Sequence, residues 1–235
     1  DMFAEAQLAI SAPLSEPWRV DAGLNYIDYQ DLDSFDQLGV NGGGRYRWNH
    51  GDWRHEAGLQ LSYTLLDGEG FENRRTLLLQ TTTQVLGDAR LRLRYRFNDL
   101  DGLGEFDGLS GRRHEAGARI TWSRPFWDFG AEYQFDVGDY DDSTLSATRH
   151  RLGVEMERTF AEGWGAMLEA SLRHSDYDLA SNGSEDRTEL ALSVSKSFGD
   201  RWRLIVRYAY TDNSADVSEF SYRGNRISAG FEATM

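Results

Sequence analysis

Apolar and polar residues alternate along most of the chain, which is typical of strands whose two faces differ. In residues 89–97 every even position is arginine, and the odd positions are alanine, leucine, tyrosine and phenylalanine. Residues 126–137 alternate in the same way, with aromatic and aliphatic residues at odd positions from 127 onward. No helical period persists beyond a turn or so. The pattern therefore predicts an all-β protein.

The alternating segments are long, and most of them run ten to fourteen residues. Strands of soluble proteins average about five or six residues, whereas a tilted strand that crosses a membrane needs about 9–11. We therefore predict a transmembrane, antiparallel, up-and-down β-barrel of about 12–16 strands. Thirteen strands are predicted, at 3–12, 18–29, 37–48, 53–65, 75–86, 89–98, 112–122, 126–137, 148–159, 164–174, 187–197, 201–211 and 222–235.

The connections between these segments alternate between short and long. Short turns are expected at 13–17, 49–52, 87–88, 123–125, 160–163 and 198–200, and the three prolines, Pro13, Pro17 and Pro125, are read as turn residues. Longer loops are expected at 30–36, 66–74, 99–111, 138–147, 175–186 and 212–221. Short turns at one end and long loops at the other are typical of outer-membrane barrels. The alternative is a large soluble β-sandwich or propeller.

Tryptophan placement supports the barrel. Every tryptophan lies within four residues of a short turn and on the apolar phase of its strand, as expected of an aromatic girdle at the periplasmic membrane boundary. In a soluble sandwich, tryptophans would be scattered through the core. The predicted girdle residues are Trp18, Trp48, Trp53, Trp122, Trp127, Trp164 and Trp202. Tyrosines gather toward the long-loop ends.

An odd number of strands conflicts with the even counts of bacterial single-chain barrels. Either segment 3–12 is a wall strand whose upstream partner precedes Asp1, which implies 14 or more strands, or it lies outside the wall and twelve strands close. The clean alternation of segment 3–12 favours the first interpretation. We therefore expect residues 1–235 to be one barrel domain, the C-terminal part of a longer protein.

Composition excludes several classes of protein. The chain contains 39 acidic and 25 basic residues, for a net charge of −14, and no cysteine. An acidic chain is repelled by phosphates, so no nucleic-acid partner is expected. The lack of cysteine excludes disulfide frameworks and thiolate metal sites. No cofactor and no metal are expected, and no run of residues is apolar enough to form a membrane-spanning helix.

The charges are strongly segregated. Six windows around the long loops, 28–37, 66–73, 99–111, 136–148, 175–186 and 211–222, contain 22 acidic residues and no lysine or arginine. The rest of the chain carries 17 acids against 25 bases, of which Lys196 is the single lysine. The loops predict an acidic extracellular rim, formed by Asp31, Asp33, Asp101, Asp107, Asp139, Asp141, Asp142, Asp178, Asp216 and Glu219.

Most arginines occupy the polar phase of their strands, which would face the lumen of a barrel. Arg113, Arg149, Arg187 and Arg226 are each followed four residues later by glycine or alanine, a repeat that predicts guanidinium groups at similar depths. The predicted lining residues are Arg90, Arg92, Arg94, Arg96, Arg113, Arg149, Arg187, Arg201, Arg203, Arg207, Arg226, Glu115, Asp128, Glu132, Glu155 and Glu157.

Two interpretations of this lining stay open. In the first, the charged residues select which ions or polymers occupy the pore, and arginine side chains bind carboxylate or hydroxyl-rich ligands. Alternatively, arginines and glutamates of neighbouring strands satisfy one another and brace the wall.

Catalytic and metal-binding signals are weak. His174, Ser175 and Asp176 stand together, but sequence neighbours on a strand point to alternating faces, so no catalytic residue is predicted. Asp139, Asp141 and Asp142 are candidate calcium ligands but lack the spacing of an EF-hand loop.

The last third of the chain resembles the C-terminal barrels of Gram-negative export porins that carry periplasmic tetratricopeptide repeats. The resemblance rests on the segments RHRLGVEMERTFAEGWGAMLEASLRHSDYD and RTELALSVSKSFGDRWRLIVRYAYTDNSADVSEFSYRGNRISAGFEATM. In both, an arginine-led strand is followed by a short turn, a second strand that begins with tryptophan, and an acidic loop. The chain departs from the pattern by ending in Met235 rather than an aromatic residue.

This resemblance implies an integral protein of the Gram-negative outer membrane that exports a hydrophilic exopolysaccharide, as in the Pel, poly-N-acetylglucosamine and cellulose systems. It also implies outer-membrane lipid and lipopolysaccharide, the translocated polysaccharide, and a periplasmic repeat domain or accessory export proteins as partners. The acidic rim suits a cationic polymer and the basic wall an acidic one. A general solute porin, a surface-lipoprotein export barrel and a barrel enzyme or adhesin are the alternatives.

Overall fold

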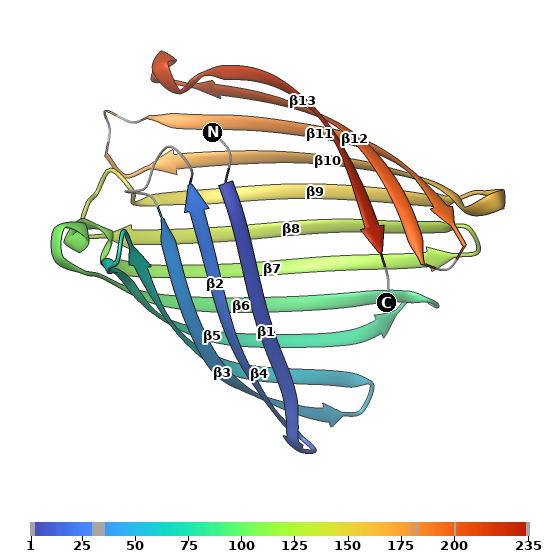
Figure 1. Cartoon of the computed structure of the whole chain (residues 1–235), viewed down its shortest axis with the longest axis horizontal. Coiled ribbons are helices and arrows are strands. Elements are labelled where there is room, and N and C mark those ends of the chain that lie inside the picture. The colour runs from blue at the N-terminus through green and yellow to red at the C-terminus, as the bar shows by residue number, and fades with distance from the viewer. Residues whose placement is uncertain (1–2, 30–35, 180, 182, 200, 234–235) are drawn as a thin grey trace. The chain divides into compact units, whose positions relative to one another are not determined.

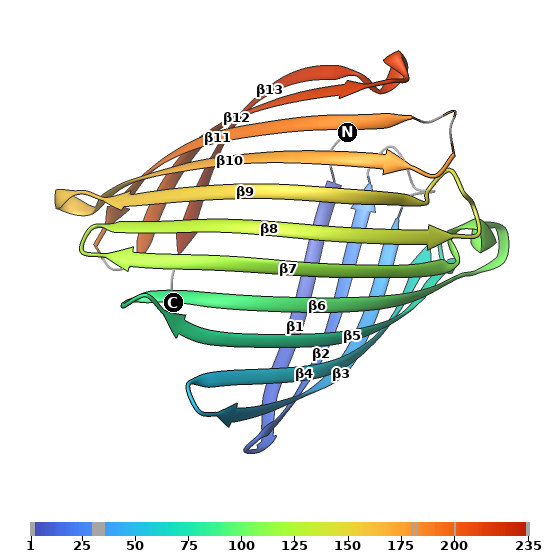
Figure 2. The same cartoon turned by 180° about the vertical axis from the view of Figure 1, so that it is seen from behind.

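The computed structural model describes residues 3–29, 36–179, 181, 183–199 and 201–233. Its thirteen strands form one sheet in which each strand neighbours the next along the chain (Figures 1 and 2). The strands are β1 Phe3–Ser15, β2 Trp18–Tyr29, β3 Gln37–His50, β4 Trp53–Leu66, β5 Glu69–Val85, β6 Ala89–Gly102, β7 Gly111–Arg124, β8 Trp127–Tyr140, β9 Ala147–Thr159, β10 Trp164–Tyr177, β11 Ser184–Phe198, β12 Trp202–Ala215 and β13 Tyr222–Ala233. Short 3₁₀ turns lie at η2 Gly104–Leu109, η3 Ala161–Gly163 and η4 Ser218–Phe220.

All thirteen predicted strands are confirmed. β1 is a wall strand, because it pairs antiparallel with β2 from Phe3 opposite Tyr29 to Ser15 opposite Trp18. The sheet order begins at β1 and ends at β13, so a further strand upstream of Asp1 stays a prediction. Several strands, such as β6 and β10, extend beyond their predicted bounds at the ends that lead into the loops, whereas β1 and β3 extend at the ends that meet the short turns.

The expected long loop at 66–74 is wrong. β4 and β5 are joined only by Asp67 and Gly68, whose φ angles are 51° and 76°. A two-residue turn with both φ angles positive matches the twist of an antiparallel hairpin. Residues 69–74, which follow this turn, are polar like a loop but form the beginning of β5.

The interpretation of Pro13 as a turn residue is also wrong. Pro13 lies inside β1, opposite Arg19, and the register between β1 and β2 shifts between Pro13 and Ser15. A proline has no N–H to donate to a ladder, and a local irregularity of this kind accommodates it.

The chain forms two compact units, which are described separately below. The first comprises residues 1–83, 93–116 and 136–146, and therefore contains β1–β4, most of β5 and the loop-side parts of β6–β8. The second comprises residues 84–92, 117–135 and 147–235, with the turn-side parts of β6–β8 and all of β9–β13.

The apolar residues form a surface and not a core. Among the described residues, the buried hydrophobic side chains are three alanines, Ala89, Ala147 and Ala191. The large apolar side chains on the apolar phase of the strands are mostly exposed, including Leu59 and Leu61 in the first unit and Leu168 and Leu172 in the second. In the described part of the chain, no helix combines the length and the apolar character needed to cross a membrane.

Candidate functional site on the polar face of the sheet

The polar face of the first unit carries paired charges. Arg45 lies 2.8 Å from Asp21 on β2 and 3.5 Å from Glu56 on β4, and Arg47 also donates to Glu56. Strand register explains this, because Arg47 is directly opposite Glu56 in the β3–β4 ladder. Adjacent polar-phase positions on neighbouring strands therefore hold opposite charges, which is the favourable cross-strand arrangement.

A second network in the same unit joins β6, β7 and β8. Arg113 Nη2 lies 2.6 Å from Asp136 Oδ2, and Arg113 Nε and Arg96 Nη1 each lie 3.4 Å from Glu115. The Glu115 side chain is 7% exposed, whereas Arg96 and Arg113 are 38% and 34% exposed. The carboxylates therefore lie against the sheet, and the longer arginines extend over them and present guanidinium groups to the outside of the face.

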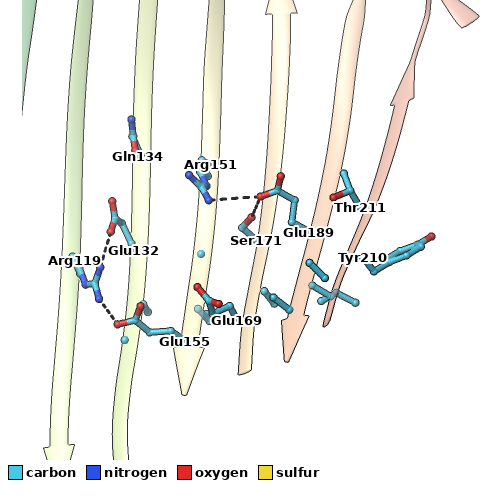
Figure 3. A pocket seen from close by; sticks show the side chains of 18 of the residues that line it. Arg119, Glu132, Gln134, Arg151, Glu155, Glu169, Ser171, Glu189, Tyr210 and Thr211 are labelled. Atoms are coloured by element: carbon cyan, nitrogen blue, oxygen red, sulfur yellow. Dashed lines mark hydrogen bonds and ion pairs between the residues drawn. The ribbon is translucent and has the colours of Figure 1, made fainter. Parts of the chain in front are cut away.

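In the second unit, the polar face is hollowed into a pocket of about 420 Å³ lined by β7–β12 (Figure 3). Arg119 reaches both Glu132, at 3.4 Å, and Glu155. On the other side of the pocket, Glu189 accepts contacts from Arg151 at 3.8 Å and from Arg187 at 2.5 Å. The pocket thus combines fixed guanidinium donors and carboxylate acceptors.

Among the described residues of the second unit, four ion pairs connect strands that are not neighbours. One joins Arg203 on β12 to Glu157 on β9 at 3.6 Å, and the other three lie in this pocket. Arg119 on β7 reaches Glu155 on β9, Arg151 on β9 reaches Glu189 on β11, and Arg207 on β12 reaches Glu169 on β10 at 2.8 Å. We call these three contacts the skip-strand pairs.

A small residue lies on the intervening strand beneath each skip-strand pair, at Gly130, Ser171 and Ala191 respectively. A Cβ atom on Gly130 would lie 2.4 Å from Glu155 Oε1, so the position needs glycine for the glutamate to cross β8. Ser171 donates its hydroxyl to Glu189, and Ala191 is directly opposite Glu169 in the β10–β11 ladder. Of these three small residues, Ala191 belongs to the repeat noticed in the sequence, whereas Gly130 and Ser171 do not.

Most predicted lining residues lie at polar-phase positions of their strands, but Arg201 lies in the turn before β12. The arginines of the sequence repeat were predicted to lie at similar depths, but Arg149 and Arg187 do not lie in the same row of the ladder. In β9–β11, Arg187 is in the row of Arg173 and Arg151, and Arg149 is two residues nearer the loop end. Tilted strands require such a stagger, because a row perpendicular to the strands is not level in a barrel. Whether these residues line a lumen stays a prediction.

In the described part of the chain, most polar-phase arginines without an ion-pair partner lie near the short turns, and the exception is Arg226, near the long-loop end of β13. Among the described residues, no carboxylate lies within ion-pair distance of Arg19 or Arg54 in the first unit, or of Arg90, Arg92 or Arg201 in the second. Each of these residues lies at, or within four residues of, a strand end that meets a short turn.

The predicted acidic rim lies on or beside the long connections. Asp101, Asp107, Asp139, Asp141, Asp142, Asp178, Asp216 and Glu219 are exposed, whereas Asp31 and Asp33 lie outside the described residues. Thr144 donates its backbone N–H and its hydroxyl to Asp142, and these bonds lower the pKa of Asp142. Within the described parts of the chain, no three potential ligands are placed to hold a metal ion.

Asp216 links two loop ends in the second unit. Its Oδ2 accepts the backbone N–H of Ser184 at 2.7 Å and the Ser184 hydroxyl at 3.0 Å, and both bonds lower the pKa of Asp216. A group with a lowered folded pKa stabilises the folded form above its ordinary pKa, and that contribution is lost as the pH falls through the lowered value.

We therefore expect the Ser184 amide resonance in an NMR titration to move with a midpoint below the ordinary carboxyl value of 3.8. Asp216→Asn, which keeps an acceptor oxygen but cannot ionise, should abolish this titration without shifting resonances of β9. A Ser184 midpoint at or above the ordinary value would show that the link is not formed in solution.

His114, His150 and His174 lie on the apolar face of the sheet. Tyr95 and His114 are 2.8 Å apart in the first unit, and Tyr133 and His150 are 2.7 Å apart in the second. His174 contacts Asp186 and Asp176, whereas Ser175 is fully buried on the polar face. The sequence neighbours His174 and Ser175 are thus directed to opposite faces, and they do not form a nucleophile and base pair.

The predicted girdle tryptophans lie where expected, on the apolar phase beside the short turns. Basic side chains stack on three of them: Arg124 lies 4.8 Å from the ring centroid of Trp122, Arg158 4.6 Å from Trp127 and Lys196 5.1 Å from Trp164. Cations over the faces of interfacial aromatic rings are favourable at a membrane boundary, where the charge remains hydrated. These contacts were not predicted from the sequence, although each basic residue occupies an apolar-phase position near a short turn, which is a visible departure from the alternation.

No protein-family model and no curated protein matches the sequence. Solved structures match it in fold. OmpT, an outer membrane protein of Vibrio cholerae, superposes with a TM-score of 0.64 at 10% identity over 97% of this chain and 88% of that one. A bacterial polysaccharide outer membrane secretin gives 0.54 at 13% identity over 97% and 89%. OpdK of Pseudomonas aeruginosa, solved with vanillate, gives 0.61 at 14% identity over 96% and 68%.

These likenesses show that the chain has the fold of an outer-membrane β-barrel. They agree with the predicted fold class and with the predicted Gram-negative outer-membrane location. They support the resemblance to an export porin only in part, because at these identities the shared property is the fold.

Proposed function

We propose that this protein is an outer-membrane pore that exports a hydrophilic polysaccharide along the polar face of its barrel wall. The observation that carries the proposal is the set of skip-strand pairs, which hold guanidinium donors and carboxylate acceptors at fixed positions in the 420 Å³ pocket. A sugar chain offers hydroxyl groups that both donate and accept, and fixed, already paired charges bind such groups without large reorganisation. Similarity in fold to a polysaccharide secretin supports the same class of substrate.

The exposed guanidinium groups favour neutral or acidic sugars over cationic ones on the wall. In the first unit, the arginines extend over carboxylates that lie against the sheet, so a passing chain meets guanidinium groups first. The acidic residues near the long loops contact the polysaccharide after it has passed the wall, at the end of the pore where it must be released. Moderate attraction at successive sites, and not tight binding at one, is what conduction requires.

We expect the purified chain to form an open channel in a planar bilayer, and neutral oligosaccharides to block its current transiently. Arg151→Gln with Arg207→Gln removes two skip-strand pairs and should shorten the blockades about tenfold, because hydrogen bonds to charged groups contribute roughly 1.5–3 kcal/mol each before compensation. The matched control is Arg124→Gln, an arginine on the apolar face, which should leave blockades unchanged.

Two results would count against the proposal. Absence of any channel, also after deletion of loop residues 103–110, would contradict a pore. Blockades of equal length in the double variant and the wild type would show that the pocket arginines do not contact the sugar.

A general solute porin is the second candidate, favoured by the similarity in fold to OpdK, which was solved with the small molecule vanillate. Deletion of the gene in its parent bacterium distinguishes the two functions. Loss of surface polysaccharide supports export, whereas slower growth on small organic solutes with normal polysaccharide supports the porin. Helical repeats of about 34 residues encoded upstream of Asp1 would favour export further.

A further inference from the structure

Basic side chains on the apolar face lie only near strand ends in the described part of the chain. Those beside the short turns, Arg124, Arg158 and Lys196, stack on tryptophans. Those toward the opposite ends of the strands lie next to aspartates. They are Arg112 and Arg223, beside long connections, and Arg75, on the strand that follows the two-residue turn after β4. Among the described residues, the arginines of the second group are paired with aspartates and are not stacked on aromatic rings.

The two levels are separated by the thickness of a membrane. Arg112 and Arg124 both lie on β7, twelve residues apart. At about 3.4 Å per residue and a tilt of about 40°, this spacing corresponds to roughly 30 Å along the membrane normal, close to the hydrocarbon thickness of a bilayer. If Arg124 lies in one headgroup layer, Arg112 lies in the other.

At this second level in the first unit, two arginines share one carboxylate. Arg75 Nη1 on β5 donates to Asp99 Oδ2 on β6 at 2.9 Å, and Arg112 Nε on β7 lies 3.9 Å from Asp99 Oδ1. The side chains of Arg75 and Arg112 are 56% and 71% exposed. The cluster has a surplus of one positive charge, and most of the five N–H donors on each guanidinium remain available.

We propose that Arg75 and Arg112 bind the phosphate group of a membrane lipid in the headgroup layer at the long-loop ends of the strands. Arginine matches phosphate geometry with two parallel hydrogen bonds, and a phosphate between two guanidinium groups uses the donors that Asp99 leaves free. The occupant is a lipid and not a free anion because the strand positions next to the cluster are apolar. Leu77 follows Arg75 on the same phase of β5, and Phe97 precedes Asp99 on β6, so acyl chains lie against the same surface.

The corresponding cluster in the second unit differs in charge. Arg223 lies 3.1 Å from Asp212, one arginine to one aspartate, and the pair has no surplus charge. It is therefore a matched control that shares the apolar phase and the proximity to a long connection. The inference depends on the membrane-spanning fold and is independent of what passes along the polar face.

The test uses the full chain in detergent micelles that contain lipid A, a glucosamine lipid with two phosphate groups, and measures retained lipid by native mass spectrometry. Arg75→Gln with Arg112→Gln should weaken retention about tenfold, as expected for the loss of charge-assisted phosphate contacts. Arg223→Gln should leave retention unchanged. Arg112→Gln alone, which removes no hydrogen bond among the described residues, should weaken retention in the same direction and serves if the double variant does not fold.

Two further arms identify the ligand chemistry. Lipid A from which both phosphates have been removed should not be retained above the level of the double variant, and millimolar inorganic phosphate should not displace the intact lipid. Equal retention by wild type and double variant, equal retention of the dephosphorylated lipid, or full displacement by inorganic phosphate would each overturn the proposal.

Discussion

Arg113→Ala is expected to lower the free energy of unfolding by about 3 kcal/mol, the lower end of the range for breaking a buried ion pair from one side. Arg113 Nη2 lies 2.6 Å from Asp136, and its Nε lies 3.4 Å from Glu115. Both carboxylates are almost fully buried against the sheet, so they cannot regain full hydration when the guanidinium is removed. The lower end is appropriate because Arg113 itself is one-third exposed and water reaches the network from its side.

The measurement is urea unfolding of the chain in phospholipid vesicles, followed by tryptophan fluorescence. Arg90→Ala is the matched control, because Arg90 is an exposed polar-phase arginine with no ion-pair partner among the described residues, and we expect a change of less than about 0.5 kcal/mol. A change of that size for Arg113→Ala as well would show that the β6–β8 network contributes nothing to stability.

Leu168→Arg is expected to destabilise the folded, bilayer-inserted chain by about 2 kcal/mol, because an arginine on the lipid-facing surface costs about 2–4 kcal/mol at the midplane and less toward the interface. Leu168 lies on the apolar phase of β10, is 46% exposed, and is four residues from Trp164 and nine residues from Tyr177 at the two strand ends. The neighbouring substitution Met167→Arg places the same side chain on the polar phase, directly opposite Glu157 in the β9–β10 ladder. It should change stability by less than about 1 kcal/mol, because an opposite charge is available across the strand pair.

Both variants are checked by their folding yield into vesicles. The yield is measured on gels, where the folded protein and the heat-unfolded protein migrate at different positions. The comparison tests only which face of the sheet carries the arginine, because the two positions are adjacent in the sequence and the introduced side chain is the same. Similar losses for the two variants would mean that the apolar phase does not face lipid. A larger loss for Met167→Arg would reverse the assignment of the faces.

The number and order of the strands were predictable because they depend on a local signal. Period-two alternation in residues such as 89–97 fixes both the strand and its two faces, and consecutive strands with short connections pair antiparallel. The error at 66–74 has a local cause as well. Residues 69–73 are too polar to show the alternation clearly, and the Asp67–Gly68 turn was therefore taken as part of a longer loop.

The candidate site was predictable only as a set of residues on one face. Of the three arginines in the skip-strand pairs, Arg207 is among the predicted lining residues, whereas Arg119 and Arg151 are not. The partners of all three depend on the register of strands two apart, which no local pattern encodes. The network of Arg113 with Glu115 and Asp136 likewise depends on three strands. Of the two interpretations of the lining, mutual pairing describes the contacts in the structure, and contact of the exposed guanidinium groups with a ligand stays a prediction.

The skip-strand pairs also have a mechanical consequence. Hydrogen bonds in the ladder connect each strand only to its neighbours, so a barrel wall under load can in principle peel one hairpin at a time. In the second unit, Arg119–Glu155, Arg151–Glu189 and Arg207–Glu169 tie β7 to β9, β9 to β11 and β10 to β12. Tension applied to β7, β9, β10, β11 or β12 is therefore shared by a strand beyond its neighbours, so these strands resist extraction together.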